Sequence, residues 1–141
     1  MRELPAGLEY TLRYRVPVTK TVPHLYPEAA PFRAMPEVFA TGFLVGFLEW
    51  ACMEALAPFL DAGERSVGMR VDISHEAATP PGMEVTAQVR LEGVDGRRTL
   101  WAVEARDEAD VIARGRHERF TIDLAKFNER LARKAATASG T

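Results

Sequence analysis

The sequence predicts an α+β domain in which one antiparallel β-sheet wraps around a long central α-helix. One supporting observation is a nearly unbroken apolar run from Val38 to Leu60, which has the length of a single long helix. The other is a set of segments in which apolar and polar residues alternate, as in half-buried strands. Because the chain has 141 residues, 47% hydrophobic and 27% charged, we expect residues 1–141 to form one globular domain.

The segment before the apolar run predicts a strand followed by a long loop. Residues 8–16 carry apolar side chains at even positions and polar ones at odd positions, and Pro17 ends the strand. Between Thr21 and Pro36, four prolines exclude a regular helix or a central strand. Since long loops in compact domains are often functional, this loop is a candidate lid or pocket wall.

The apolar run predicts a buried helix. Thr41 is the expected N-cap, and Asp61-Ala62-Gly63 ends the helix. The run would nearly span a bilayer, but it contains Glu49 and Glu54, and a charge near mid-membrane costs about 2–3 kcal/mol or more. We therefore expect the core helix of a soluble protein, with no membrane partner. Because nearly all faces of this helix are apolar, other structure must surround it.

Four further strands are predicted after the helix. Their ranges are 67–74, 83–92, 99–106 and 111–122, and short turns at 94–97 and 107–110 make neighbours antiparallel. The first of them places its odd residues, Val67, Met69, Val71 and Ile73, on the apolar face. Asp123 is expected to cap a short final helix, and the tail 136–141 should fray.

These elements together predict the hotdog fold, a curved sheet around one central helix. A single sheet face cannot enclose a helix that is apolar on nearly all sides, so a second copy of the chain is expected to cover the rest. The predicted assembly is a homodimer, or a larger homo-oligomer built from it.

Composition excludes several classes of protein. The net charge is -2, so no basic excess indicates a nucleic-acid partner. Cys52 is the single cysteine, and with the three histidines it lacks the spacing of a zinc site, so no metal is expected. The N-terminal residues contain no apolar signal segment, which favours a cytoplasmic location. The sequence has no phosphate-binding glycine motif and no nucleophile elbow.

Glu49 is the first candidate for chemistry, because no other charge lies within seven residues before it. A carboxylate in such surroundings either finds a partner or has its pKa raised by desolvation. Perturbed carboxylates in clefts are frequent functional residues. The alternative is a side chain that only reaches solvent or bonds to a backbone group.

His75 and Thr41 are the other two candidates. His75 continues the odd, inward positions of its predicted strand, and an inward histidine near an inward Glu49 suits proton transfer near neutral pH. A core histidine bonded to a carbonyl is the alternative. Thr41 begins the helix, where free N–H groups favour developing negative charge, although it could be a cap alone.

The spacing of these candidates constrains any shared site. Thr41 and Glu49 are eight residues apart, which is about 12 Å along a helix. They therefore cannot touch within one chain. Two antiparallel central helices across a dimer axis would bring them together.

Several motifs of the chain resemble the fluoroacetyl-CoA thioesterase family. They cover almost the whole sequence and are His24–Glu28, Pro36–Phe43, Glu49–Cys52, His75–Gly82, Glu92–Arg98, His117–Arg119 and Lys126–Asn128. The resemblance implies a hotdog dimer that hydrolyses an acyl-CoA thioester. It also implies that Thr41, Glu49 and His75 occupy the positions of the family's catalytic residues.

The same resemblance implies substrate-binding positions. Gly68 matches a glycine beside the acyl group, and Val22, Leu25 and Phe32 match lid and pocket residues. Where the family has a gating phenylalanine this chain has Met35, which is flexible and lacks an aromatic edge, so the preferred acyl group stays open.

The phosphates of CoA require cationic neighbours. Four basic residues are candidates for this role: Lys20, Arg33, Arg116 and Arg119. Arg119 also shares a predicted strand face with His117, so these two either bond to each other or to a ligand phosphate.

We therefore expect hydrolysis of a short-chain acyl-CoA to a free acid and CoA. Glu49 would attack the carbonyl or activate water, and His75 would handle the proton. No cofactor is expected, because thiolate is already a good leaving group and CoA is part of the substrate. The alternatives are a hotdog enoyl-CoA hydratase and a non-hydrolytic acyl-CoA binding module.

Overall fold

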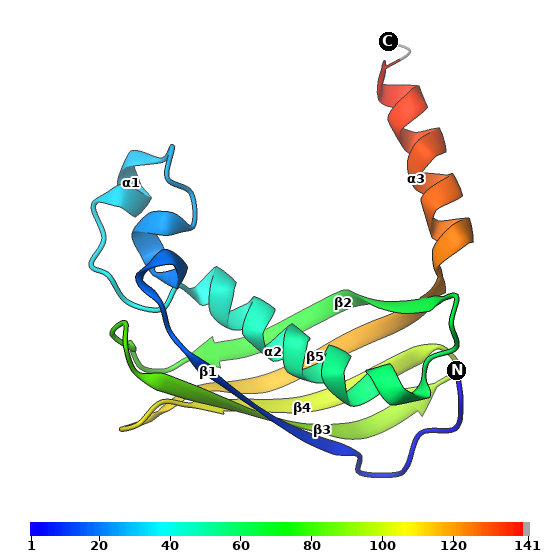
Figure 1. Cartoon of the computed structure of the whole chain (residues 1–141), viewed down its shortest axis with the longest axis horizontal. Helices are drawn as coiled ribbons and strands as arrows, with labels where there is room; N and C mark the ends of the chain where they lie inside the picture. The colour runs from blue at the N-terminus through cyan, green and yellow to red at the C-terminus, as the bar shows by residue number, and fades with distance from the viewer. Residues whose placement is uncertain (140–141) are drawn as a thin grey trace.

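The computed structural model describes residues 1–139 and shows five antiparallel strands curved around one long helix (Figure 1). The strand order across the sheet is β1-β3-β4-β5-β2, so β1 and β2 form its edges. The strands are β1 (Glu9–Arg15), β2 (Glu64–His75), β3 (Glu84–Asp95), β4 (Arg98–Arg106) and β5 (Val111–Asp123). The helices are α1 (Ala30–Arg33), α2 (Thr41–Leu56) and α3 (Leu124–Ser139), with single 3₁₀ turns η1 (Val18–Lys20), η2 (Val22–His24) and η3 (Ala57–Phe59). The predicted α+β hotdog architecture is confirmed.

The core lies between α2 and the concave face of the sheet (Figure 1). Every second residue of β4 is buried, and β3 follows the same alternation, as predicted. The packed side chains include Leu44, Leu48, Cys52 and Leu56 of α2, Val85, Ala87 and Val89 of β3, and Trp101, Val103 and Ala105 of β4. Burying each large aliphatic side chain stabilises the fold by about 1.5–3 kcal/mol. Burial also raises the pKa of the Cys52 thiol to about 12, so this cysteine is an inert core residue.

The apolar composition of α2 fits either a membrane span or the core helix of a folded domain. Together with η3 it spans Thr41–Phe59, which is long and apolar enough to cross a membrane by length and composition. A core helix meets the same criteria, and the buried side chains of α2 pack on the sheet. The contacts therefore explain its apolar composition without a bilayer.

Both predicted tight turns are confirmed. Gly96 and Arg97 connect β3 to β4, and Gly96 has a φ of 61°, which a two-residue hairpin turn of this type requires. Between β4 and β5, the Asp107 N–H donates to the Asp110 carbonyl.

The loop before α2 differs from the prediction because it contains helical turns. Between Thr21 and Pro36 the chain forms η2 and the single-turn helix α1. Pro31 lies in the first turn of α1, where its missing N–H has no helical partner to lose. The prolines therefore limit these helices to one turn and do not exclude them.

The inward face predicted for β2 is wrong at Val67. Gly68 pairs with Arg119 and Arg70 pairs with Glu118, so Met69 is an extra, bulged residue. A bulge reverses which residues face the helix. Gly68 faces α2 before the bulge, and Ile73 faces it afterwards, so Val67 points to the opposite face.

The final helix is longer than predicted. Asp123 caps it as expected, accepting a hydrogen bond of 3.0 Å from the Lys126 N–H. The helix α3 then continues to Ser139, because Ala135, Ala136 and Ala138 favour helix over the predicted frayed tail. Residues 140 and 141 of that tail lie outside the described residues.

Candidate active site

The first polar cluster lies at the N-terminal end of α2 and joins Thr41 to His75. The Thr41 Oγ1 is 2.7 Å from the His75 Nδ1. His75 ends β2 on the inward side, as predicted from its parity with Ile73. Burial lowers the pKa of His75, an effect that the nearby Ala77 backbone partly offsets. The buried Nε2 makes no hydrogen bond with any residue among 1–139.

The predicted N-cap role of Thr41 is wrong. Thr41 is the first residue inside α2, and Ala40 holds the N-cap position without a side-chain hydrogen bond. The local sequence favours a threonine cap, but the hydroxyl bonds instead to His75, which is 34 residues away along the chain. The hydroxyl of Thr41 is thereby oriented toward β2.

The second polar cluster surrounds Glu49, two turns further along α2. The Arg119 Nη1 donates to the Glu49 Oε1 at 3.0 Å, and the His117 Nε2 lies 3.9 Å from the same oxygen. The Arg119 side chain is 3% exposed, whereas the Glu49 side chain is 34% exposed. The sequence predicted that Glu49 either finds a partner or has its pKa raised by burial, and the structure shows a partner, the charged side chain of Arg119. A partly exposed carboxylate held through one oxygen keeps the other available for chemistry.

Gly68 faces the carboxylate of Glu49 across the gap between β2 and α2. A Cβ at this position would overlap the Glu49 Oε1 and would lie in ordinary contact with the His117 ring and the Arg119 guanidinium. Any side chain here would therefore push Glu49 away from Arg119. A glycine at this position therefore leaves the space in which the Glu49 carboxylate meets Arg119.

We expect Gly68→Ala to displace Glu49 from Arg119 and to lower the free energy of unfolding by about 1–3 kcal/mol, since the buried guanidinium loses one of its acceptors. Gly93→Ala is the matched control, because Gly93 also lies next to a bulge in a strand but has open space where a Cβ would lie. That control should change stability by less than about 0.5 kcal/mol. Urea denaturation of both variants makes the comparison, and equal losses would contradict this account of Gly68.

The predicted substrate-binding residues of the loop before α2 lie in two regions. Leu25 packs on the first turn of α2, where a Cβ on Gly42 would lie 3.0 Å from it, and the Val22 N–H donates to the Val38 carbonyl. Both therefore lie close to the start of α2. Phe32 packs against Tyr26 with ring centroids 5.5 Å apart, and Met35 is 48% exposed.

The candidate phosphate-binding cations have different environments. Arg119 is buried and donates to Ser66 and Glu49, so its guanidinium cannot meet a phosphate at the surface. Arg116 is paired with Glu92 at 2.8 Å, and Lys20 lies over the Phe43 ring at 4.6 Å. The remaining candidate, Arg33, is exposed and donates to the Pro27 carbonyl at 2.8 Å.

The two clusters lie apart within one protomer. Thr41 and Glu49 project from the same side of α2, about 12 Å apart along its axis. Their partners on β2, His75 and Gly68, are seven residues apart. Among residues 1–139, no hydrogen bond or ion pair joins His75 to Glu49, so the predicted neighbourhood of these two side chains does not form within one chain.

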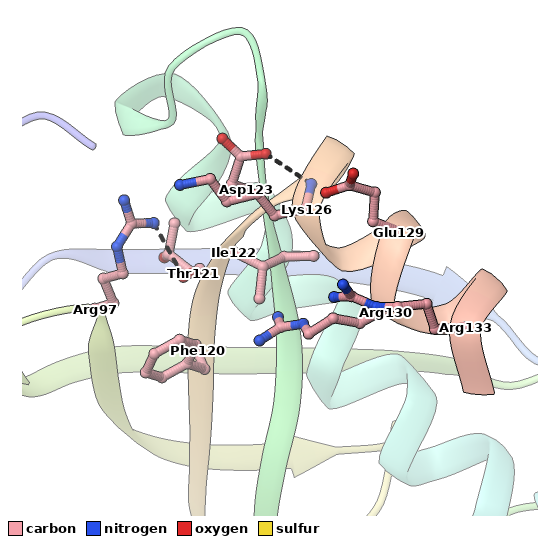
Figure 2. A pocket seen from close by; sticks show the side chains of 9 residues that line it. All are labelled: Arg97, Phe120, Thr121, Ile122, Asp123, Lys126, Glu129, Arg130 and Arg133. Atoms are coloured by element: carbon pink, nitrogen blue, oxygen red, sulfur yellow. Dashed lines mark hydrogen bonds between the residues drawn. The ribbon is translucent and has the colours of Figure 1, made fainter.

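Thr41, His75, Glu49 and Arg119 do not line either of two further cavities. One, of about 460 Å³, lies between β5 and α3, where Lys126, Arg130 and Arg133 gather (Figure 2). Its wall includes Phe120 of β5. The preceding residue in the strand, Arg119, points to the opposite face of the sheet and contacts Glu49. The sheet therefore separates this cavity from the Glu49 cluster. Another, of about 280 Å³, is lined by aromatic rings beside α2, and its wall includes Gly46 and Trp50, which lie close to Glu49 along the helix.

Comparisons with known proteins agree with this architecture. The family model of the fluoroacetyl-CoA-specific thioesterase matches residues 22–125. The chain is 51% identical to the fluoroacetyl-CoA thioesterase of Streptantibioticus cattleyicolor over 128 residues, which is 91% of this chain and 92% of the relative. It is similar to the structure of a phenylalanine-to-alanine variant of such an enzyme in complex with fluoroacetate and CoA, with a TM-score of 0.86, 51% identity and coverage of 88% and 99%. It is also similar to a thioesterase superfamily member of Thermus thermophilus, with a TM-score of 0.90, 30% identity and complete coverage of both chains.

Proposed function

Because this chain belongs to the fluoroacetyl-CoA-specific thioesterase family, and therefore hydrolyses an acyl-CoA thioester, we propose that Thr41, His75 and Glu49 carry out the reaction. The substrate is a short acyl-CoA, and the active site is shared by two copies of the chain. The observation that carries these assignments is the state of Glu49, which is held by Arg119 through Oε1 and is partly open to solvent. Among residues 1–139, no side chain donates to its second oxygen, Oε2.

A homodimer would complete the site. The edge strand β2 is 12 residues long and, within the described part of the chain, pairs with β5 alone, and long unpaired edges favour further strand pairing. Exposed large apolar side chains lie on this strand and on α2: Met69, Val71, Trp50 and Met53. A second copy related by a two-fold axis would cover them and would run its α2 antiparallel to the first. Glu49 of one copy would then approach Thr41 and His75 of the other.

The chemistry follows from these groups. As the Glu49 carboxylate accepts a proton from water, the water oxygen bonds to the thioester carbonyl carbon. The carbon–sulfur bond then breaks, and the proton passes through His75 to the departing thiolate, which gives a free acid and CoA. In the second route, Glu49 itself bonds to the carbonyl carbon, CoA leaves, and water hydrolyses the resulting anhydride. In both, Thr41 and the N-terminal N–H groups of α2 stabilise the carbonyl oxygen as it becomes negative.

The pH dependence should report His75. Because burial lowers its pKa, the ring stays neutral, and able to accept a proton, to a pH below the ordinary histidine value of about 6.5. We expect kcat/KM to be constant from about pH 7 to 8 and to fall on the acid side with a midpoint below about 6.5. Thiol release measured from pH 4.5 to 8 tests this. The residual activity of His75→Gln should not show this fall on the acid side. A midpoint above about 6.5 in the wild type would contradict the role proposed for His75.

The acyl pocket is proposed near the start of α2. Val22 and Leu25 lie there beside Thr41, Phe32 lies on α1, and Met35 follows the end of that helix. Met35 is exposed and flexible, so acyl groups other than fluoroacetyl should be accepted. A screen of thiol release over acyl-CoAs of different length and halogenation identifies the preferred substrate.

No cofactor is proposed, because the thioester is activated by its own leaving group and CoA belongs to the substrate. Among residues 1–139, no group of three or more histidine, cysteine, aspartate or glutamate residues is arranged to hold a metal ion. A cytoplasmic location and a dimeric or larger assembly remain predictions.

The decisive experiment follows two signals from the purified chain with acetyl-CoA and an enoyl-CoA. Free thiol should appear with acetyl-CoA, while the conjugated double bond of the enoyl thioester should not be lost by hydration. Loss of the double bond without thiol release would indicate a hydratase. Binding without either reaction would indicate an acyl-CoA binding module.

A further inference from the structure

His117 is a buried titratable residue that the proposed mechanism does not use. It lies on β5, its side chain is 2% exposed, and both ring nitrogens have partners. The Nδ1 is 2.8 Å from the Arg70 carbonyl, and the Nε2 is 3.1 Å from the Arg119 Nη1. Arg70 directly follows the bulge at Met69, so an irregularity of β2 supplies this carbonyl.

These partners determine the protonation state of the ring. A carbonyl only accepts hydrogen bonds, so the Nδ1 must carry the proton. A guanidinium only donates, so the Nε2 must present a lone pair to Arg119. His117 is therefore the neutral Nδ1–H tautomer. Burial, with a smaller contribution from the charge of Arg119, lowers the pKa of His117 and stabilises this state, while Glu49 and Glu118 act in the opposite direction.

The guanidinium of Arg119 is held on three sides. Its Nε donates to the Ser66 Oγ at 2.9 Å, and its Nη2 donates to the Ser66 carbonyl at 2.8 Å. Its Nη1 faces both the His117 Nε2 and the Glu49 Oε1. Because a guanidinium is planar and rigid, acceptors at three of its edges determine where the Nη1 lies.

We propose that His117 is a positioning residue for the thioesterase reaction, which acts by orienting Arg119 so that Arg119 holds the Oε1 of Glu49. Held in this way, the Oε2 of Glu49 is directed at the bound thioester or its attacking water. His117 itself does not contact the substrate. The inference rests on the proposed role of Glu49 and adds the residues that set its orientation.

The first test replaces His117 by phenylalanine, which keeps a ring but loses both hydrogen bonds. Since catalytic geometry tolerates little displacement, we expect kcat for acetyl-CoA to fall about 10- to 100-fold while KM changes less than about twofold. His117→Gln should recover most of kcat, because its amide oxygen accepts a hydrogen bond from Arg119. A merely structural role would not produce this recovery at equal stability.

Two further variants keep the test independent of folding. Thr79→Val removes the hydrogen bond that the buried Thr79 hydroxyl donates to Asp107 at 2.8 Å, and should lower stability without lowering kcat. Ser66→Ala removes only the hydroxyl that accepts from the Arg119 Nε, and should lower kcat with a loss of stability no larger than that of Thr79→Val. If His117→Phe does not fold, Ser66→Ala and His117→Gln decide the question.

The outcomes separate this inference from the proposed function. Wild-type kcat in both folded His117→Phe and Ser66→Ala, together with an inactive Glu49→Gln, would overturn the positioning role alone. An increase in KM with kcat unchanged in His117→Phe would also overturn it. Full activity of Glu49→Gln would overturn the proposed role of Glu49 instead.

Discussion

Replacing Glu49 by glutamine is expected to reduce thiol release by about 10²- to 10⁴-fold, the range lost with a general base, or further if Glu49 is the nucleophile. Glutamine has nearly the same shape, and its amide oxygen can still accept the hydrogen bond from Arg119. The fold and the affinity for acyl-CoA should therefore persist. A thiol-release assay combined with calorimetric binding of acetyl-CoA measures both effects.

Glu54→Gln is the matched control for this prediction. Glu54 lies on the same helix, is exposed, and accepts a hydrogen bond of 3.2 Å from the Trp50 indole. Its replacement should leave kcat within about twofold of the wild type, as for an exposed residue outside the site. Near wild-type activity in Glu49→Gln would remove Glu49 from the mechanism, and equal losses in both variants would point to a general effect on α2.

The second large effect is expected from mixed dimers. If one copy supplies Thr41 and His75 and the other supplies Glu49, a dimer of Thr41→Ala with Glu49→Gln contains one intact site and one doubly defective site. Each parental homodimer should be nearly inactive. The heterodimer, isolated through two different affinity tags, should regain about half of the wild-type activity per dimer.

The control for this experiment pairs Thr41→Ala with His75→Ala. Both changes lie in the same half of the shared site, because the Thr41 Oγ1 and the His75 Nδ1 are 2.7 Å apart within one chain. Neither site of that heterodimer is intact, so its activity should stay at the parental level. Absence of recovery with Thr41→Ala and Glu49→Gln, in a heterodimer shown to be stable, would mean that the site is not shared in this way.

The main elements were predictable because each depends on a short stretch of chain. Alternation of apolar and polar residues identified all five strands, and the apolar run identified α2. The side chain of Asp123 caps α3 as predicted, because an N-cap needs only a backbone N–H three residues further along the chain. The same local rule failed at Thr41, where a distant histidine binds the hydroxyl instead.

The candidate site was predictable in its residues but not in its contacts. Glu49 was identified by the absence of nearby charges, yet its partner Arg119 is 70 positions away. Ser66 carried no pattern that could have singled it out, because its role depends on the bulge at Met69, which reverses the facing of β2. The sequence left open whether His117 and Arg119 bond to each other or to a ligand phosphate. The structure shows that both side chains are buried and that they bond to each other.

The sequence by itself therefore determined the fold class, the family and the three residues expected to react, because periodicity, composition and motifs are properties of neighbouring residues. Only the tertiary structure decided that Thr41 pairs with His75 while Glu49 pairs with Arg119, and that these pairs lie apart within one protomer. The physical reason is that hydrogen bonds between distant residues depend on strand register and on a bulge. Both are determined by packing across the whole sheet, which no local pattern encodes.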